Sequence, residues 1–120
     1  MSLGSLGLVL VSVALSAIAQ VAFKFGVAST PSPAVRALFG PLSILLLPGV
    51  LGGLALYGIA TLLWLTALAR VELSQAYPFV GIGFVLTTLA GWWLFDDKIT
   101  TTRVFGIALI ALGTVLVARS

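Results

Sequence analysis

Four polar side chains follow one another at intervals of four residues along the first apolar segment: Ser12, Ser16, Gln20 and Lys24. Residues four apart lie on the same face of a helix, so the segment presents a polar stripe that rises about 18 Å at 1.5 Å per residue. The Gln20 amide and the Lys24 ammonium could hydrogen-bond a polar solute. Packing is the alternative for the serines, and Lys24 could instead extend its long side chain to the membrane surface.

A second set of polar and aromatic residues repeats at intervals of four and three: Tyr57, Thr61 and Trp64. This spacing places the three side chains on one face of a helix. An aromatic stripe of this kind is more often packing than a binding site, and both interpretations stay open. We treat the three residues, and the cation Arg70 that follows them, as candidates for contact with a substrate.

Pro78 interrupts the third apolar segment near its start. It lacks an N–H donor and therefore removes one helical hydrogen bond, and Gly81 and Gly83 soften the same stretch. This pattern predicts a hinge whose freed carbonyls could contact a solute, with a static kink as the alternative. In a regular helix Tyr77, Gly81 and Thr88 share one face, which we expect to line a path beside the polar stripe.

The residue types that are missing exclude several kinds of chemistry. The chain has no cysteine and no histidine, so it lacks thiolate metal ligands and the commonest general base. Its three acidic residues, Glu72, Asp96 and Asp97, all lie between apolar segments. A proton-coupled exporter of organic cations would need a carboxylate inside the membrane. We expect no catalysis, no cofactor and no metal ion.

The elements that position these residues must be membrane helices. The 120 residues are 61% hydrophobic and 8% charged, against about 45–50% and about 25% in soluble domains. A soluble fold of this size could not bury so much apolar surface. About 20 apolar residues cross the bilayer core, and helices satisfy their backbone groups there. The net charge of +3 is expected to meet anionic lipid headgroups rather than nucleic acid.

The predicted fold is therefore all-α, a single four-helix transmembrane bundle over residues 1–120. The expected spans are about residues 3–24, 48–69, 73–95 and 101–118. Residues 34–46 are expected to form a helix at the membrane surface or an extension of the second span. Basic residues are divided too evenly between the two sides to fix the orientation of the termini.

Two glycines of the fourth span, Gly106 and Gly113, lie on one face and allow another helix to approach closely. Packing within the subunit is one use of this face. Four helices alone enclose a solute path poorly, so we expect a dimer. Its interface is predicted at Gly106, Leu109, Ile110 and Gly113.

Three segments, in this order, resemble the small-multidrug-resistance-like proteins of the drug/metabolite transporter superfamily. They are Ser16-Ala17-Ile18-Ala19-Gln20 with Lys24, Ala76-Tyr77-Pro78, and Gly106-x-x-Leu109-Ile110-x-x-Gly113. Within that superfamily the chain is most similar to the paired subunits that flip 4-amino-4-deoxy-arabinose-phosphoundecaprenol. The exporters' essential glutamate in span one falls at about Ser16 here, which favours the flippase-like branch.

The resemblance implies a subunit in the bacterial inner membrane that flips an amphiphilic, polyprenyl-phosphate-linked sugar. It would act as a homodimer, or as a heterodimer with a related four-helix subunit. Sugar hydroxyls are expected on Ser16, Gln20, Tyr77 and Thr61, and the phosphate on Lys24 or Arg70. Two alternatives are proton-coupled efflux of small cations and a non-transporting scaffold subunit. A scaffold would have a tightly packed interior, with Gln20 bonded within the protein.

Overall fold

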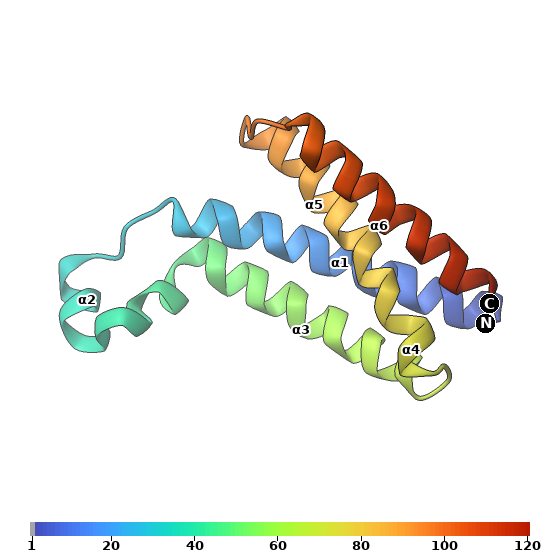
Figure 1. Ribbon diagram of the computed structural model, residues 1–120. Helices are drawn as coiled ribbons and strands as arrows, with labels where there is room; N and C mark the ends of the chain where they lie inside the picture. Colours follow the sequence, from blue (N-terminus) through green and yellow to red (C-terminus); the bar gives the residue numbers. More distant parts are fainter. Residues whose placement is uncertain (1) are drawn as a thin grey trace.

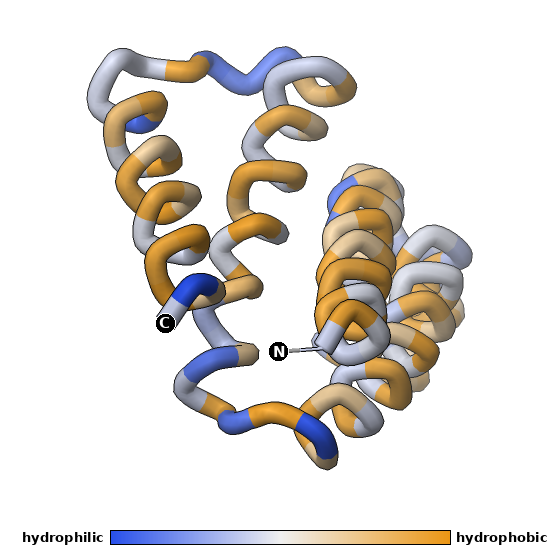
Figure 2. The backbone as a smooth tube through the Cα atoms, turned by 90° about the vertical axis from the view of Figure 1, so that its right-hand side faces the viewer, coloured by the Kyte–Doolittle hydropathy of each residue, from blue (hydrophilic) through white to orange (hydrophobic). Residues whose placement is uncertain are grey.

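The computed structural model describes residues 2–120, so Met1 of the predicted domain lies outside the described residues. Four of its helical stretches are long and apolar enough to cross a membrane. They are Leu3–Val27 (α1), Pro48–Leu68 (α3), Leu73–Leu94 and Thr101–Arg119 (α6). The third stretch is made of Leu73–Ala76 (α4), Tyr77–Phe79 (η2) and Val80–Leu94 (α5). The prediction of an all-α fold with four membrane-spanning helices is confirmed, and Figure 2 shows mainly apolar helices with hydrophilic turns.

Local polar contacts fix where the spans begin. Before α1, the Ser5 N–H donates to the hydroxyl of Ser2 at 3.1 Å. Before α6, the Arg103 N–H donates to the hydroxyl of Thr100, also at 3.1 Å. Pro48 begins α3, at the position where a missing N–H leaves no helical hydrogen bond unmade. Each of these signals is local in the sequence, which is why apolar length and caps suffice to place the helices.

The segment between α1 and α3 folds into two short helices, Pro33–Phe39 (α2) and Gly40–Leu46 (η1). Gly40 has φ +58°, a left-handed conformation that suits glycine, and it ends α2. The two short helices lie beyond the ends of α1 and α3 in Figure 1. Leu38 and Leu42 are strongly exposed there, which suits a segment at a membrane surface.

Helices α1 and α3 run antiparallel and pack closely through glycines. A Cβ atom on Gly26 would lie 2.5 Å from the backbone nitrogen of Val50, and one on Gly49 would lie 2.6 Å from the Cα atom of Gly26. Further along, a Cβ atom on Gly53 would lie 2.6 Å from the ring of Phe23. Small residues therefore let the two backbones approach each other, as is usual between helices in lipid.

Helices α5 and α6 form the second antiparallel pair, which crosses the first at an angle (Figure 1). The two pairs meet in a small apolar core formed by Val9 and Val13 of α1, Ala67 of α3 and Phe79 of η2. The structure measures 53 × 37 × 18 Å, so the helices form a thin assembly. Only 6% of the apolar window of α6 is buried, which leaves most of that helix facing outward.

Candidate functional site

Three neighbouring cavities lie between α1, α3 and α5 and together form what we call the α1–α5 groove. Their volumes are about 190, 430 and 270 Å³. Ser16, Tyr57 and Gly83 line both the first and the second cavity. Gln20 and Thr87 line both the second and the third. Because adjacent cavities share walls, the groove follows α1 along much of its length.

The polar stripe of α1 enters the groove step by step. Ser12 is buried, and its hydroxyl donates to the carbonyl oxygen of Ala60 in α3 at 2.8 Å. Ser16 lines the first two cavities, Gln20 the second and third, and Lys24 the third. Each step of four residues turns about 40° around a helix, so the stripe winds from α3 towards α5. Ser12 packs the helices together, whereas the other three residues face the groove.

The three polar groups of the stripe that face the groove make no hydrogen bond to other residues within 2–120. Thr61, which also lines the groove, differs from them, because its hydroxyl donates to the carbonyl oxygen of Tyr57 at 2.8 Å. Gln20 and Lys24 are exposed in the single chain. An amide without a partner in lipid costs free energy, so Gln20 can hydrogen-bond a polar group that enters the groove.

Aromatic side chains line the first cavity. The rings of Trp64 and Tyr77 approach edge to face, with centroids 6.3 Å apart, and both residues line that cavity with Tyr57. The Tyr57 ring is in turn 6.3 Å from the ring of Phe23. The aromatic stripe predicted on the second span therefore both packs and lines the groove. Flat apolar rings of this kind can contact the apolar face of a sugar ring.

The turn at η2 changes which side of α5 faces the groove. A 3-10 helix turns about 120° per residue instead of about 100°, so three residues advance the following helix by about 60°. The expectation that Gly81 and Thr88 line the path with Tyr77 is therefore wrong. A Cβ atom on Gly81 would lie 2.5 Å from the Ile110 side chain of α6, and Thr88 lines a separate cavity between α5 and α6.

Other residues of α5 take their place in the groove: Val80, Gly83, Phe84 and Thr87. The regular-helix assumption missed them, although Tyr77, Val80, Phe84 and Thr87 repeat at intervals of three, four and three. The break at Pro78 is present as the 3-10 turn Tyr77–Phe79. The hydroxyl of Thr114 lies 2.9 Å from the Pro78 carbonyl oxygen and satisfies it. The structure describes this break in one conformation.

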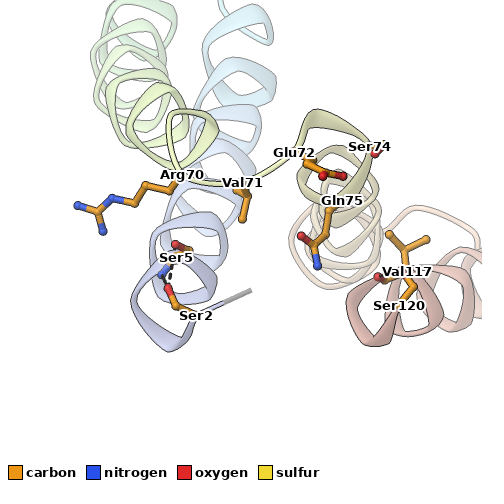
Figure 3. Close-up of a pocket in the computed structure, with 9 residues that line it drawn as sticks. All are labelled: Ser2, Ser5, Arg70, Val71, Glu72, Ser74, Gln75, Val117 and Ser120. Carbon is orange, nitrogen blue, oxygen red and sulfur yellow. Dashed lines mark hydrogen bonds between the residues drawn. The ribbon is translucent and has the colours of Figure 1, made fainter.

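The two candidate cations lie at opposite ends of the molecule. Lys24 lines the third cavity, near the α5–α6 turn. Arg70 borders a polar cavity of about 640 Å³ at the end where both termini lie, with Ser5, Glu72 and Gln75. Figure 3 shows the Arg70 side chain extending away from Glu72 and Gln75. One phosphate could not contact both cations, and only Lys24 belongs to the groove.

The third cavity also contains two residues that the sequence did not single out, Phe95 and Asp97. The Phe95 ring lies 4.7 Å from the ring of Phe25 at the end of α1. The sequence does not predict that Asp97 lies at the same cavity as Lys24, because the two residues are far apart along the chain. Among residues 2–120 no three potential ligands come together to hold a metal ion.

The face predicted to form a dimer interface lies on the outside of α6. A Cβ atom on Gly106 or Gly113 would meet nothing within 4 Å. Leu109 is 67% exposed and Ile110 is 36% exposed, although Ile110 also contacts Gly81. The described chain thus leaves these glycines uncovered.

Four apolar spans around a partly polar groove define a small multi-pass membrane transport protein. The profile of the family described as Small Multidrug Resistance protein matches residues 44–110. The chain belongs to this family and is a multi-pass transport protein of the bacterial inner membrane.

Relatives match over most of the chain. The uncharacterized protein y4nH of Sinorhizobium fredii is 35% identical over 105 residues, which cover 87% of this chain and 86% of that protein. The probable 4-amino-4-deoxy-L-arabinose-phosphoundecaprenol flippase subunit ArnE of Pseudomonas fluorescens is 35% identical over 118 residues, covering 96% and 97%. The probable flippase subunit ArnE of Pseudomonas aeruginosa strain UCBPP-PA14 is 43% identical over 63 residues, which span 52% of this chain and 55% of that protein. No solved structure matches.

Proposed function

We propose that this chain is a subunit of a transporter that flips a polyprenyl-phosphate-linked sugar across the inner membrane. The α1–α5 groove is the single observation that carries the proposal. It places Ser16, Gln20 and Lys24 in sequence along one wall, and these groups have no partner within the described chain. A headgroup that moves along this wall exchanges one hydrogen-bonding partner for the next.

The groove would hold the polar headgroup of an amphiphilic cargo and leave its apolar tail outside. The second cavity, of about 430 Å³, lies within the range of small-molecule binding sites, about 300–1,000 Å³, and could accept a sugar headgroup. Gln20 is exposed on its open side, so the groove is not sealed from the surrounding lipid by this chain. The polyprenyl tail would remain in the bilayer while the sugar hydroxyls contact Ser16, Gln20 and Thr87. Tyr57 lines both the first and the second cavity and would contact the apolar face of the sugar, and Tyr77 and Trp64 would contact it in the first cavity.

Lys24 is the cation that would pair with the phosphate. It lines the same cavity as Gln20, whereas Arg70 lies at the other end of the chain. An ammonium on a flexible stem can follow a phosphate as a point charge without a fixed geometry. The name of the ArnE relatives, which match 96% of this chain in one case, supports a lipid-linked sugar as the cargo.

A second subunit would complete the groove. We propose that Gly106, Leu109, Ile110 and Gly113 form the contact with it, because this face of α6 is open and small residues suit close helix contact. The partner would be a second copy or a related four-helix subunit. A non-transporting scaffold is less well supported, because its interior would be packed and Gln20 would be bonded within the protein.

The proposal is tested by reconstituting the chain in vesicles, alone and together with a related four-helix subunit. The vesicles carry a fluorescent polyprenyl-phosphate pentose, and its movement between leaflets is followed by chemical quenching from outside. We expect flipping well above that of protein-free vesicles. The proposal would be wrong if the chain moved no lipid-linked sugar in either arrangement. Efflux of small organic cations driven by a proton gradient would then support the exporter alternative.

A further inference from the structure

A polar cavity of about 640 Å³, which we call the terminal cavity, lies at the end of the molecule where both termini lie (Figure 3). Ser5 of α1, Gln75 of α4 and Val117 of α6 all contribute to its lining. Arg70 borders it from the turn after α3. None of these four residues lines the α1–α5 groove, so the terminal cavity is a separate polar space.

A layer of apolar side chains, which we call the partition, separates the terminal cavity from the groove. Its residues are Val9, Ala67 and Phe79, and at most 3% of each is exposed. Four positions from each of them, on one side, is a residue that lines the terminal cavity: Ser5, Val71 and Gln75. Three or four positions away, on the other side, is a residue that lines the first cavity of the groove: Ser12, Trp64 and Gly83. The partition is therefore one layer of side chains thick.

Ser5 continues the polar stripe of α1 beyond the partition. It lies seven residues before Ser12, and about two helical turns bring the two residues to nearly the same face. From Ser5 to Lys24 the helix rises about 28 Å, close to the ~30 Å thickness of the hydrocarbon core. The terminal cavity and the Lys24 cavity thus lie near opposite headgroup layers. A headgroup that crosses the bilayer along α1 has to pass the partition.

We propose that the terminal cavity is a second binding site for the sugar-phosphate headgroup, on the side of the membrane opposite Lys24, and that the partition is the barrier between the two sites. The inference rests on the proposed function. Arg70 would bind the phosphate at the rim, because a guanidinium can pair with two phosphate oxygens. The Gln75 side chain extends into the space between Ser5 and Ser120 in Figure 3, where its amide could hydrogen-bond sugar hydroxyls.

The partition is closed to a headgroup in the described conformation. Val9 and Ala67 are 0% exposed, so no opening passes between them. Their side chains offer no hydrogen-bonding group, and a polar headgroup that crosses them gives up its partners at a cost in free energy. The size and polarity of the side chains in the partition should therefore set the rate of flipping, whereas Arg70 and Gln75 should set binding in the terminal cavity.

Binding in the terminal cavity is tested with single cysteines, since the chain has none of its own. The probe is a polyprenyl-phosphate pentose with a maleimide on its sugar, and labelling of folded protein in detergent is followed by mass spectrometry. Ser74→Cys places the thiol at the cavity, and Leu73→Cys places it on a neighbour that does not line it. We expect Ser74→Cys to react at least about tenfold faster, because binding holds the maleimide beside the thiol.

The contribution of Arg70 is measured in the Ser74→Cys protein. Arg70→Gln should slow its labelling about tenfold, the effect of one charge-assisted contact. Arg36→Gln removes a cation of α2, which does not line the cavity, and should leave labelling unchanged. An excess of unmodified polyprenyl-phosphate pentose should prevent labelling. Phosphatidylglycerol also carries a phosphate and hydroxyls, and equal competition by it would overturn a site for the lipid-linked sugar in favour of a general phospholipid site.

The partition is tested by the flipping rate in vesicles. Val9→Ala shortens a side chain of the barrier and should raise the rate several-fold, whereas lost stability would lower it. Ala67→Ser places a hydroxyl in the barrier with little change in volume and should also raise the rate. Val11→Ala makes the same change as Val9→Ala on an exposed face of α1 and should match wild type. Flipping of phosphatidylcholine should stay slow in all three variants.

The inference and the proposed function fail in different ways. Equal labelling of Ser74→Cys and Leu73→Cys, or labelling that unmodified lipid does not prevent, would overturn the second site. Rates at or below wild type in both Val9→Ala and Ala67→Ser would overturn the barrier. Flipping by wild type without labelling of Ser74→Cys would refute the inference and keep the proposed function. Saturable labelling by a chain that flips no lipid-linked sugar would keep the site and refute the function.

Discussion

The hydroxyl oxygen of Thr114 lies 2.9 Å from the carbonyl oxygen of Pro78, and this contact ties α6 to the 3-10 turn that precedes α5. The same hydroxyl lies 2.9 Å from the carbonyl oxygen of Ile110 in its own helix, so one proton is shared between two acceptors. Thr114 is the buried residue of α6. Its hydroxyl therefore stabilises the backbone break at which the orientation of α5 is set.

Thr114→Val should destabilise the protein by about 1 kcal/mol. The substitution keeps the volume of the side chain but removes the hydroxyl that joins α6 to the Pro78 carbonyl, which retains only the Val80 N–H as a donor. One hydrogen bond contributes about 0.5–1.5 kcal/mol to stability. The free energy of unfolding in mixed micelles measures the effect. Thr66→Val is the control, because the Thr66 hydroxyl bonds only to Leu62 of its own helix. Equal losses in the two variants would show that the contact with Pro78 contributes nothing.

Gly26→Ala should separate the start of α3 from the end of α1. The added Cβ atom would lie 2.5 Å from the Val50 nitrogen, which is backbone and cannot rotate away. We expect a loss of about 1–3 kcal/mol in the free energy of unfolding. Gly52→Ala is the matched control in α3, where a Cβ atom meets nothing within 4 Å. That variant should be neutral or gain up to about 1 kcal/mol from helix propensity, and a loss equal to that of Gly26→Ala would contradict the packing described.

Two adjacent threonines of α5 test which side of that helix faces the groove. Thr87 lines the groove, whereas Thr88 lies between α5 and α6. Both hydroxyls bond back to carbonyls of their own helix, so valine removes a similar contact from each. In the reconstituted flipping assay Thr87→Val should slow transport several-fold and Thr88→Val should not. Slow transport by Thr88→Val and normal transport by Thr87→Val would show instead that the third span is one regular helix, with Thr88 facing the groove.

Large side chains on the open face of α6 should block association without disturbing the single chain. Gly106→Leu and Gly113→Leu add bulk where the described residues leave space. Sedimentation in detergent should show less dimer, either of the chain alone or with a co-expressed related subunit. Gly58→Leu adds the same bulk to an open position of α3 and should leave the dimer intact. Unchanged association of both α6 variants would place the interface elsewhere.

The sequence predicts the helices far better than it predicts which faces meet. Apolar length and the caps at Ser2 and Thr100 are local, so the four spans could be expected from them. The stripe of Gln20 and Lys24 could also be recognised, because it lies within one helix. The proline predicts a break near residue 78 but not its form, a 3-10 turn that rotates Gly81 out of the groove and Thr87 into it.

The sequence also does not predict which distant segments contact each other. Ser12 could be either a packing residue or a lining residue until its bond to Ala60 was known. Arg70 and Lys24 were equal candidates for a phosphate, because their positions at opposite ends depend on the antiparallel arrangement of α1 and α3. Asp97 joins the Lys24 cavity through the crossing of two helix pairs, for which no local pattern exists.

The most direct test of the α1–α5 groove is the flipping rate of a polyprenyl-phosphate pentose by Gln20→Leu. Gln20 lines two of its three cavities, and leucine keeps a similar size while it removes the amide. With equal amounts of folded protein in the vesicles, we expect Gln20→Leu to flip the lipid at least about tenfold more slowly than wild type, the effect of one or two hydrogen bonds, and Thr66→Val to match wild type. Flipping by Gln20→Leu at the wild-type rate would contradict a headgroup path along this face of α1.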